Sequence, residues 1–320
     1  MYNVRQYVED CLASIYAQPK VQQVEVILVD DGSPDDSAAV AEAWLRANTD
    51  LKNWRIISQK NLGLGGARNT GLSACRAPYV WFIDTDDEIA PGALAAALTE
   101  LTAQPDTLAF CAKDMSTGEL QITRQKRTLS GKDYLREPYD KRPSFYVSAC
   151  LQIWSTRFLK ENSLRFQEHL LHEDSEFSPR AIYYAEKICE IPDVLYLIRP
   201  NPESITRKPN PQRALHTLKV CNMLFYFTNS SVAEHEVKTQ LYKEIGALLL
   251  STFIHSAFMD KDSLGEFIIA LRKTDQRIFD TIACLGNRQR FVALLFKVLS
   301  VQPALFIYTK IIRPILDRKQ

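Results

Sequence analysis

Two apolar runs that each end abruptly in acidic residues constrain the fold of this chain more than any other feature. The run VEVILV (24–29) is followed by DDGS (30–33), and the run YVWFI (79–83) is followed by DTDD (84–87). Both runs are short, continuous and rich in β-branched or aromatic side chains, which predicts buried strands. The Asp, Gly and Ser residues directly behind them indicate tight turns. The chain is therefore expected to contain a sheet whose strands end in carboxylates.

Helical patterns lie between these predicted strands. Ser37 can cap a helix over Ala38–Ala47, a short strand is predicted at Trp54–Ser58, and a glycine-rich stretch at 61–71 opens another helix. Strands that alternate with helices predict a parallel sheet covered by helices on both faces, which is the α/β class of fold. The carboxyl ends of such strands lie at one edge, where ligands bind. The two acidic turns are therefore expected to share one cleft.

The pattern changes further along the chain. Residues 113–165 read as irregular and mixed, and the chain beyond Pro211 reads as helical without a β-rich run. A chain of 320 residues with 46% hydrophobic side chains can fill one large core, or a catalytic core with a smaller domain attached. We predict a catalytic domain over residues 1–210 and a helical C-terminal region over residues 211–320.

The acidic turn at 84–87 is the first candidate for chemistry. It places three carboxylates within four residues, and burying them at a sheet edge without a cation is costly. A hard divalent ion such as Mg²⁺ or Mn²⁺ offsets that cost and keeps waters or diphosphate oxygens as further ligands. A solvated acidic turn is the alternative, and the position directly behind an apolar strand favours the metal site over it.

Two further segments are candidates for ligand binding. Asp30 and Asp31 can accept hydrogen bonds from a base or a ribose, although Asp is also common in ordinary turns. The stretch GLGGARNTG (63–71) can present backbone N–H groups to an anion, and Arg68 can add a diphosphate contact. This stretch is not a P-loop, because no Lys-Ser or Lys-Thr pair follows it. Close packing of the helix is the alternative role for its glycines.

Charged residues further along the chain can serve the same cleft. Asp174 lies just before a predicted helical run and can take a proton from an attacking hydroxyl, although the helix dipole alone also favours an acidic start. Arg199 and Arg207 can clamp phosphates over the cleft. A plain solvated connection also fits their loop, which is rich in Pro and Asn.

In this order and at this spacing, the segments resemble family 2 glycosyltransferases from Tyr2 to about Thr206. The resemblance is carried by the runs YNVRQYVEDCLASIYAQ, VEVILVDDGSPDDS, NLGLGGARNTGL, YVWFIDTDDEIAPGAL, LRFQEHLLHEDSEF and LYLIRPNPESIT. It implies a nucleotide-binding fold of the type called GT-A and a sugar transfer that inverts the anomeric carbon. The implied donor is a nucleotide sugar, with UDP the frequent nucleotide of the family. The implied acceptor is a hydroxyl of a surface polysaccharide or lipid-linked glycan.

The resemblance also implies roles for individual side chains. The side chains implied to bind the nucleotide sugar are Tyr2, Asp30, Asp31, Arg68, Asp84, Asp86 and Arg199. Asp86 and Asp87 are implied to meet a Mn²⁺ or Mg²⁺ ion, which acts as a Lewis acid on the leaving diphosphate. Asp174 is the implied general base, which activates the acceptor hydroxyl for in-line displacement without a covalent intermediate.

One departure from the family pattern concerns the N-terminus. Members of the family usually begin with an apolar strand that ends in a Tyr-Asn pair like Tyr2-Asn3, whereas this sequence opens at Met1-Tyr2. We therefore expect the first, central strand of the fold to be missing, through an internal start or a fragment. Its loss would expose backbone groups of the neighbouring strands.

The remaining composition bears on location. The first residues carry charges of both signs, unlike a signal peptide, and no apolar run reaches about eighteen residues. The seven cysteines are scattered without a Cys-x-x-Cys pair, which favours a reducing compartment. We expect a cytoplasmic protein.

The C-terminal segment 287–320 differs in charge from the rest of the chain. It holds seven basic residues and one acidic residue, a net charge of +6 in a chain whose total is +1. Contact with the anionic inner face of a membrane is slightly favoured for this segment. A helical subdomain that packs on the core or forms a dimer is the alternative.

Two other functions compete with the transferase. A nucleotidyltransferase also uses carboxylates and a metal, but its glycine-rich phosphate loop should follow the first strand, and none occurs near residue 5. A truncated, non-catalytic relative that acts as a scaffold is favoured by the missing strand and opposed by the intact set Asp84, Asp86 and Asp174.

Overall fold

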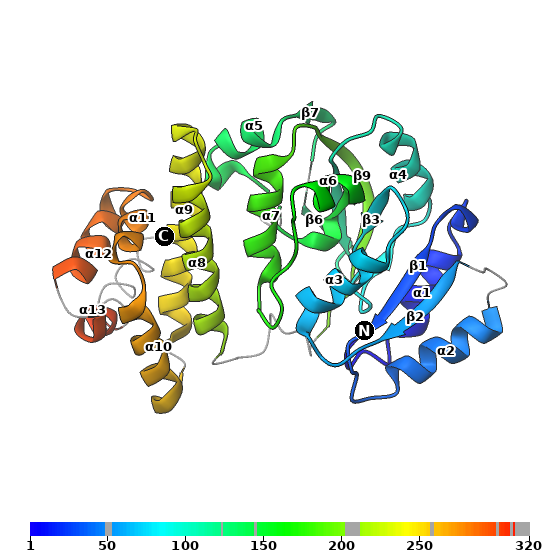
Figure 1. The fold of residues 1–320 in the computed structure, drawn as a ribbon, viewed down its shortest axis with the longest axis horizontal. Helices are drawn as coiled ribbons and strands as arrows, with labels where there is room; N and C mark the ends of the chain where they lie inside the picture. Colours follow the sequence, from blue (N-terminus) through cyan, green and yellow to red (C-terminus); the bar gives the residue numbers. More distant parts are fainter. Residues whose placement is uncertain are drawn as a thin grey trace. The chain divides into compact units, whose positions relative to one another are not determined.

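The computed structural model describes residues 1–48, 53–122, 124–143, 146–201, 212–256, 259–298, 301–307 and 310. The chain divides into two compact units (Figure 1). One unit comprises Met1–Tyr134 and Arg142–Pro202, and the other comprises Leu135–Lys141 and Glu203–Gln320. All described strands belong to the first unit.

The larger sheet of the first unit is mixed. Its strand order is β3 (Tyr79–Trp81), β8 (Gln152–Ser155), β5 (Thr107–Asp114), β9 (Ile188–Ile198), β4 (Glu88–Ile89), with β6 (Leu120–Ile122) on β5 and β7 (Arg127–Leu129) on β9. Strands β5 and β9 are parallel, whereas β8 and β4 run antiparallel to their neighbours. The expectation of a parallel sheet is wrong here. Strand β8 comes from the stretch that showed no periodicity, and it inserts between β3 and β5.

A second sheet holds two parallel strands, β1 (Val26–Asp30) and β2 (Trp54–Ser58). The amino group of Met1 donates to the carbonyl of Val29 at 2.6 Å, and the N–H of Asp31 donates to the carbonyl of Met1 at 3.0 Å. Met1 therefore takes the last position of a parallel ladder beside β1. Across residues 1–48, 53–122 and 146–201, no ladder joins β1 to β3, so the two sheets are separate.

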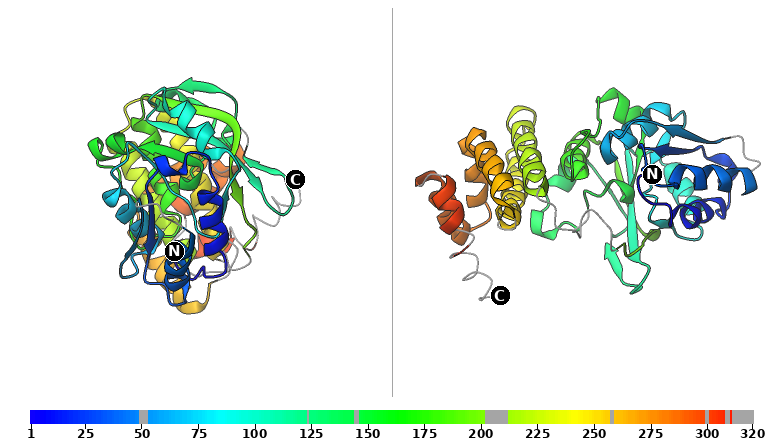
Figure 2. Two further views of the ribbon diagram at one scale, coloured as in Figure 1. Left: turned by 90° about the vertical axis from the view of Figure 1, so that its right-hand side faces the viewer. Right: turned by 90° about the horizontal axis from the view of Figure 1, so that it is seen from below.

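Amphipathic helices pack on these sheets, as the views in Figure 2 show. The helices are α1 (Val8–Tyr16), α2 (Ser37–Asn48), α3 (Gly63–Ala74), α4 (Ala93–Leu101), α5 (Gly131–Arg136), α6 (Thr156–Glu161) and α7 (Glu173–Tyr184), with short 3₁₀ turns at Val21–Gln23 and Ala149–Leu151. In α1 the buried side chains Val8, Cys11, Leu12 and Ile15 follow the helical period, which is why this helix presents one face to the core. Helix α3 packs on β1 and on α7, and so it connects two parts of the first unit.

The second unit is helical in all of its described elements. These are a 3₁₀ turn (Tyr139–Lys141), α8 (Gln212–Ser230), α9 (His235–Ser256), α10 (Lys261–Lys273), a second 3₁₀ turn (Gln276–Phe279), α11 (Asp280–Ala283), α12 (Asn287–Val298) and α13 (Val301–Ile307). A Cβ atom at Gly246 would lie 2.4 Å from the carbonyl oxygen of Thr281, so glycine allows α9 to approach α11. The rings of Phe253, Phe279 and Phe296 stack at the centre of this unit. None of the described helices combines the length and the apolar character that crossing a bilayer requires.

Candidate active site

The acidic turn at residues 84–87 lies between β3 and β4, and Tyr196 of β9 forms hydrogen bonds with it. The N–H of Asp84 donates to the Tyr196 hydroxyl at 3.1 Å, and the N–H of Asp87 donates to the carbonyl of Asp84 at 3.0 Å. The carboxylate of Asp87 accepts from the Tyr196 hydroxyl and, at 2.8 Å, from the N–H of Arg199. Because Tyr196 is fully buried, these bonds fix both ends of the turn.

The carboxylates of this turn are desolvated and crowded. Burial, together with the neighbouring charge of Asp84, raises the pKa of Asp87 to about 8. The same two causes, burial first, raise the pKa of Asp86. Charge that is expensive to bury without a positive partner is characteristic of ligand sites. The turn is therefore built to receive positive charge.

The donor chemistry of the turn fits a hard divalent cation, since Asp86 and Asp87 are adjacent carboxylates in a desolvated place. A preassembled cluster of three ligands does not occur among the residues that the structure describes. Instead, each carboxylate has another partner. Asp84 faces Arg68, and Asp86 accepts from the side-chain amide of Asn201 at 2.9 Å.

The first acidic turn, behind β1, is organised around Asp31. One carboxylate oxygen of Asp31 accepts from the side chain of Gln59 at 2.7 Å and from the N–H of Leu62 at 2.8 Å. Asp30 accepts from the N–H of Ser33 at 3.1 Å. Both carboxylates are buried, whereas the side chain of Tyr2 is half exposed. Tyr2 directly follows Met1, whose carbonyl bonds to Asp31, and so it lies beside this turn.

The glycine-rich stretch forms the start of α3, where it packs against the segment 166–169. A Cβ atom at Gly65 would lie 2.2 Å from the carbonyl oxygen of Gln167, so this position requires glycine. The side chain of Asn69 donates to the carbonyl of Phe166 and accepts from its N–H, at 2.9 and 3.0 Å. Close packing, the alternative role considered for these glycines, is therefore the role of Gly65. Anion binding by this stretch stays a prediction.

Arg68 projects from α3 between two carboxylates. Its guanidinium donates to Asp84 at 2.9 Å and to the carboxylate of Glu173, and the side chain is only 7% exposed. Burial by itself lowers the pKa of Arg68, but the charges of Asp84 and Glu173 outweigh burial and raise it. The predicted contact with a diphosphate stays a prediction, because the structure shows the guanidinium engaged by protein carboxylates.

The predicted base lies at the start of α7. Helix α7 begins at Glu173 after His172, which has a positive φ of 61°. The carboxylate of Asp174 accepts from the N–H of Ser175 at 2.7 Å, and burial raises its pKa. Burial also raises the pKa of Glu173 to about 7, against the lowering effect of Arg68. Two adjacent carboxylates with raised pKa values are suited to proton transfer near neutral pH.

Arg199 directly follows β9, and its backbone N–H contacts the acidic turn at Asp87. Its guanidinium pairs with Asp10 at 2.9 Å and with Glu88, and it lies over the ring of Tyr7 at 5.6 Å. The phosphate contact predicted for Arg199 stays a prediction. Arg207, the second predicted clamp, lies outside the described residues.

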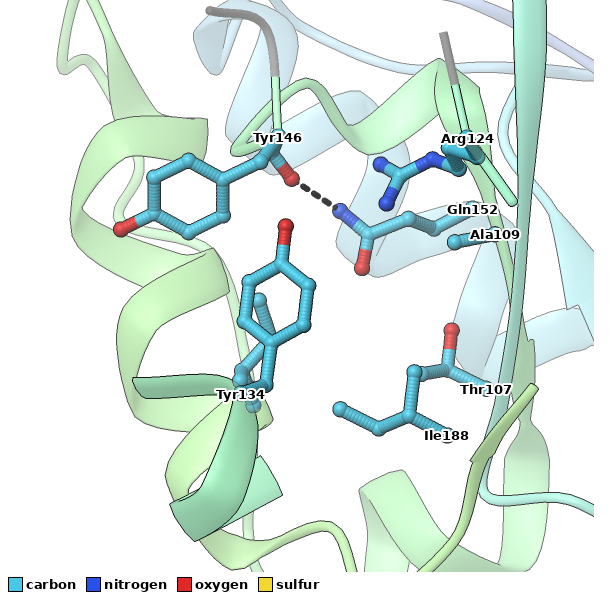
Figure 3. Close-up of a pocket in the computed structure, with 8 residues that line it drawn as sticks. Thr107, Ala109, Arg124, Tyr134, Tyr146, Gln152 and Ile188 are labelled. Carbon is cyan, nitrogen blue, oxygen red and sulfur yellow. Dashed lines mark hydrogen bonds between the residues drawn. The ribbon is translucent and has the colours of Figure 1, made fainter. Parts of the chain in front are cut away.

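A small cavity elsewhere in the first unit contains none of the predicted site residues (Figure 3). Its lining includes Thr107 and Ile188, the first residues of β5 and β9, whereas the acidic turn contacts Arg199 beyond the last residue of β9. The amide of Gln152 donates to the carbonyl of Tyr146 at 2.8 Å across one wall (Figure 3).

Three contacts of the site were missed by sequence reasoning. Tyr196, Asn201 and Glu173 all contact residues that were singled out. Tyr196 and Asn201 belong to the run LYLIRPNPESIT, which carried part of the resemblance, and Glu173 is adjacent to the predicted base. Their partners lie 105 to 115 positions away in the sequence, so no local pattern indicates the contacts.

The sheets, the helices around them and the carboxylates at the strand ends define a GT-A fold. Solved structures agree: that of S. aureus TarS 1-349 in complex with UDP-GlcNAc superimposes with a TM-score of 0.75 at 20% sequence identity, covering 98% of this chain and 90% of that one. The family model "Glycosyl transferase family 2" matches residues 1–163. This chain belongs to glycosyltransferase family 2.

Two relatives illustrate the range of the family. The glycosyltransferase EpsJ of Bacillus subtilis is 32% identical over 65% of this chain, and the match spans 62% of EpsJ. The amylovoran biosynthesis glycosyltransferase AmsE of Erwinia amylovora is 29% identical over 62% of this chain and 73% of its own length. The chain thus spans about three fifths of EpsJ and about three quarters of AmsE.

Proposed function

We propose that this chain transfers a sugar from a nucleotide-sugar donor to a hydroxyl group of a glycan, with inversion at the anomeric carbon. The observation that carries the proposal is the junction of the acidic turn with the start of α7. Asp84 and Glu173, which neighbours Asp174, are held by the same guanidinium of Arg68. One site thereby holds carboxylates for the ribose and for a divalent cation at the donor diphosphate, and a carboxylate for proton removal.

The donor is expected to be a UDP-sugar, as in the TarS complex with UDP-GlcNAc. Tyr2 would stack near the base, and Asp31 and Asp30 would accept hydrogen bonds from the base and the ribose. Asp84 and Asp86 would lie along the ribose and the diphosphate, with Arg199 above them. The half-exposed Tyr2 directly follows Met1, whose carbonyl accepts from the N–H of the buried Asp31, and this supports the placement.

Asp86 and Asp87 would hold Mn²⁺ or Mg²⁺, because they are adjacent carboxylates whose burial beside Asp84 disfavours their negative charge in the absence of a positive partner. When bound, such an ion supplies electrostatic stabilisation of the diphosphate leaving group. Tyr196 and the N–H of Arg199 keep the Asp87 carboxylate directed within the turn. Asn201 does the same for Asp86.

Asp174 would act as the general base. Its carboxylate is partly buried, and its raised pKa makes it a stronger base than an exposed aspartate. It would accept the proton of the acceptor hydroxyl while the hydroxyl oxygen attacks the anomeric carbon from the face opposite the diphosphate. Displacement in one step inverts the configuration, and no covalent enzyme intermediate is required.

The acceptor is expected to be a surface polysaccharide or a lipid-linked glycan, in keeping with the role in amylovoran biosynthesis that the name of AmsE states. We further propose a cytoplasmic location, with contact between segment 287–320 and the inner membrane face through its net charge of +6. Liposome flotation tests that contact. Equal flotation of the full chain and of a chain ending before Asn287 would refute it.

Hydrolysis of a panel of nucleotide sugars, with and without Mn²⁺ or Mg²⁺, tests the proposed function. The expected result is metal-dependent hydrolysis of one donor, which Asp86→Ala abolishes. Asp133 lies on α5, outside the site, so Asp133→Asn serves as the control for the loss of a carboxylate and should leave hydrolysis unchanged. UDP binding without turnover would support the scaffold alternative. The absence of both UDP binding and turnover would contradict the proposed donor site.

A further inference from the structure

The contacts of Arg68 connect three elements that are distant in the sequence. The guanidinium extends from α3 and forms ion pairs with Asp84, behind β3, and with Glu173, the first residue of α7. The partners are 16 and 105 positions away from Arg68. No other ion pair among the described residues reaches both the acidic turn and the start of α7.

The body of α3 holds this guanidinium in place. Asn69, the next residue, makes two hydrogen bonds with the backbone of Phe166, and the Arg68 guanidinium lies over the Phe166 ring at 5.4 Å. Gly65 sets the close approach of the helix to the same segment. The planar fork of arginine donates to two carboxylates at once, whereas the single ammonium group of lysine does not span them in the same way.

The environment of Arg68 suits a protein contact better than a ligand contact. The side chain is 7% exposed, and a diphosphate would have to compete with two carboxylates that already occupy the two terminal nitrogens. Within the described residues, the Nε atom is buried without a hydrogen-bond partner, so the ion pairs of Arg68 are made by its two terminal nitrogens alone.

We propose that Arg68 is a positioning residue that sets the spacing between the acidic turn and the helix that carries Asp174, and that Glu173 anchors it. This inference rests on the proposed function for its catalytic consequence, because the spacing matters where a donor and an acceptor must meet. Displacement of a reacting group by about 1 Å can cost about 100-fold in rate. Loss of the fork is therefore expected to lower kcat while leaving the affinity for the donor nearly unchanged.

The test compares Arg68→Lys and Glu173→Gln with Glu190→Gln. Glu190 is an equally buried carboxylate of β9 that pairs with Arg124 and Arg127, away from the acidic turn, so its variant controls for the loss of a buried ion pair. Three quantities are measured on the full chain: the Kd of UDP with Mn²⁺ by calorimetry, kcat and KM for hydrolysis of UDP-GlcNAc, and amide hydrogen exchange of peptides covering 84–87 and 172–178.

The expected result is a kcat about 100-fold lower in Arg68→Lys and Glu173→Gln, with Kd and KM within about 3-fold of the unchanged protein. Hydrogen exchange that is faster at 172–178 relative to the rest of the first unit is expected in both variants, whereas in Glu190→Gln, which lowers the stability of the unit, any increase should not be confined to 172–178. A 10-fold or larger loss of UDP affinity in Arg68→Lys at unchanged kcat would make Arg68 a donor ligand and overturn the inference. Unchanged hydrogen exchange at 172–178 in these variants would also overturn the inference.

Failure of the proposed function gives a different result. If the unchanged protein neither binds UDP nor hydrolyses UDP-GlcNAc, the proposed function is contradicted. Hydrogen exchange still decides the structural part, since it reports the link between the turn and α7 without any turnover.

Discussion

Two buried arginine clusters in the same unit use similar residues in opposite proportions. At the candidate site, one arginine, Arg68, faces Asp84 and Glu173, with Asp174 beside them. In the second cluster, one glutamate, Glu190, faces Arg124 and Arg127. Two carboxylates share one guanidinium in the first cluster, and two guanidinium groups share one carboxylate in the second.

The difference between the two clusters indicates different roles, one in a ligand site and one in structural support. Around Arg68, burial of the surplus carboxylates raises the pKa of Glu173 to about 7, so part of the negative charge is unfavourable as long as no cation or proton arrives. Around Glu190, two arginines satisfy one buried carboxylate, and Arg127 remains 36% exposed. We infer that the first cluster is arranged for chemistry and the second for holding β7 against β9.

Asp174→Asn should produce the largest effect and sharpen the comparison. Removal of a general base typically costs 10² to 10⁴-fold in rate, and we expect about 10³-fold in kcat for sugar transfer or donor hydrolysis. The Kd of UDP with Mn²⁺ should stay within about 3-fold, because Asp174 does not contact the acidic turn directly. A variant with near-normal turnover would remove Asp174 from the mechanism.

Glu190→Gln should reduce stability more than Glu173→Gln. Breaking a buried ion pair costs about 3–5 kcal/mol, and the Glu190 variant removes the shared carboxylate of two ion pairs, those with Arg124 and Arg127. After Glu173→Gln, Arg68 still has Asp84. Urea unfolding, followed by a signal from the first unit, checks the order. Equal losses would mean that the two clusters serve stability alike.

Stability should fall as the pH rises from about 4.5 to about 7. The pKa of Glu173 is raised from 4.5 to about 7 in the folded chain, so the folded state binds more protons than the unfolded state between these values. The expected loss is about 2–3 kcal/mol, completed near pH 7. In Glu173→Gln the dependence over this range should be weaker. An unchanged profile in that variant would show that another group is responsible.

Tyr196→Phe should lower the affinity for Mn²⁺ in the presence of UDP by about 10-fold, with a small loss of stability. The variant removes the acceptor of the Asp84 N–H and the donor to the Asp87 carboxylate, and each such bond contributes about 1–2 kcal/mol. Titration calorimetry measures the affinity. Tyr134→Phe is the matched control, because it removes another buried tyrosine hydroxyl, which lines the small cavity away from the acidic turn.

Arg127→Ala should have the smallest effect. Its side chain is partly exposed, and Glu190 keeps Arg124, so a loss of at most about 1 kcal/mol is expected. Donor hydrolysis should not change. A large loss of activity would mean that the second cluster also contributes to the site.

The strand ends of the site could be predicted from the sequence because their signal is local. Asp30 and Asp84 each follow an apolar run directly, and Asp174 lies at the start of a helical pattern. Strand β8 could not be predicted, since its four residues QIWS show no distinctive period and its neighbours come from distant segments. The engagement of Arg68 by Glu173 across 105 positions was equally hidden, because ion pairing depends on the packing of α3 against segment 166–169.

The separation of the two sheets has a mechanical consequence. Asp31 belongs to the sheet of β1 and β2, and Asp86 to the turn behind β3, and no ladder joins these sheets in the described residues. A nucleotide that contacts both carboxylates would hold the two sheets in a fixed position relative to each other. Part of the binding free energy would then offset the loss of motion between the two sheets. A modest affinity would therefore reflect flexibility of the protein rather than poor complementarity of the pocket.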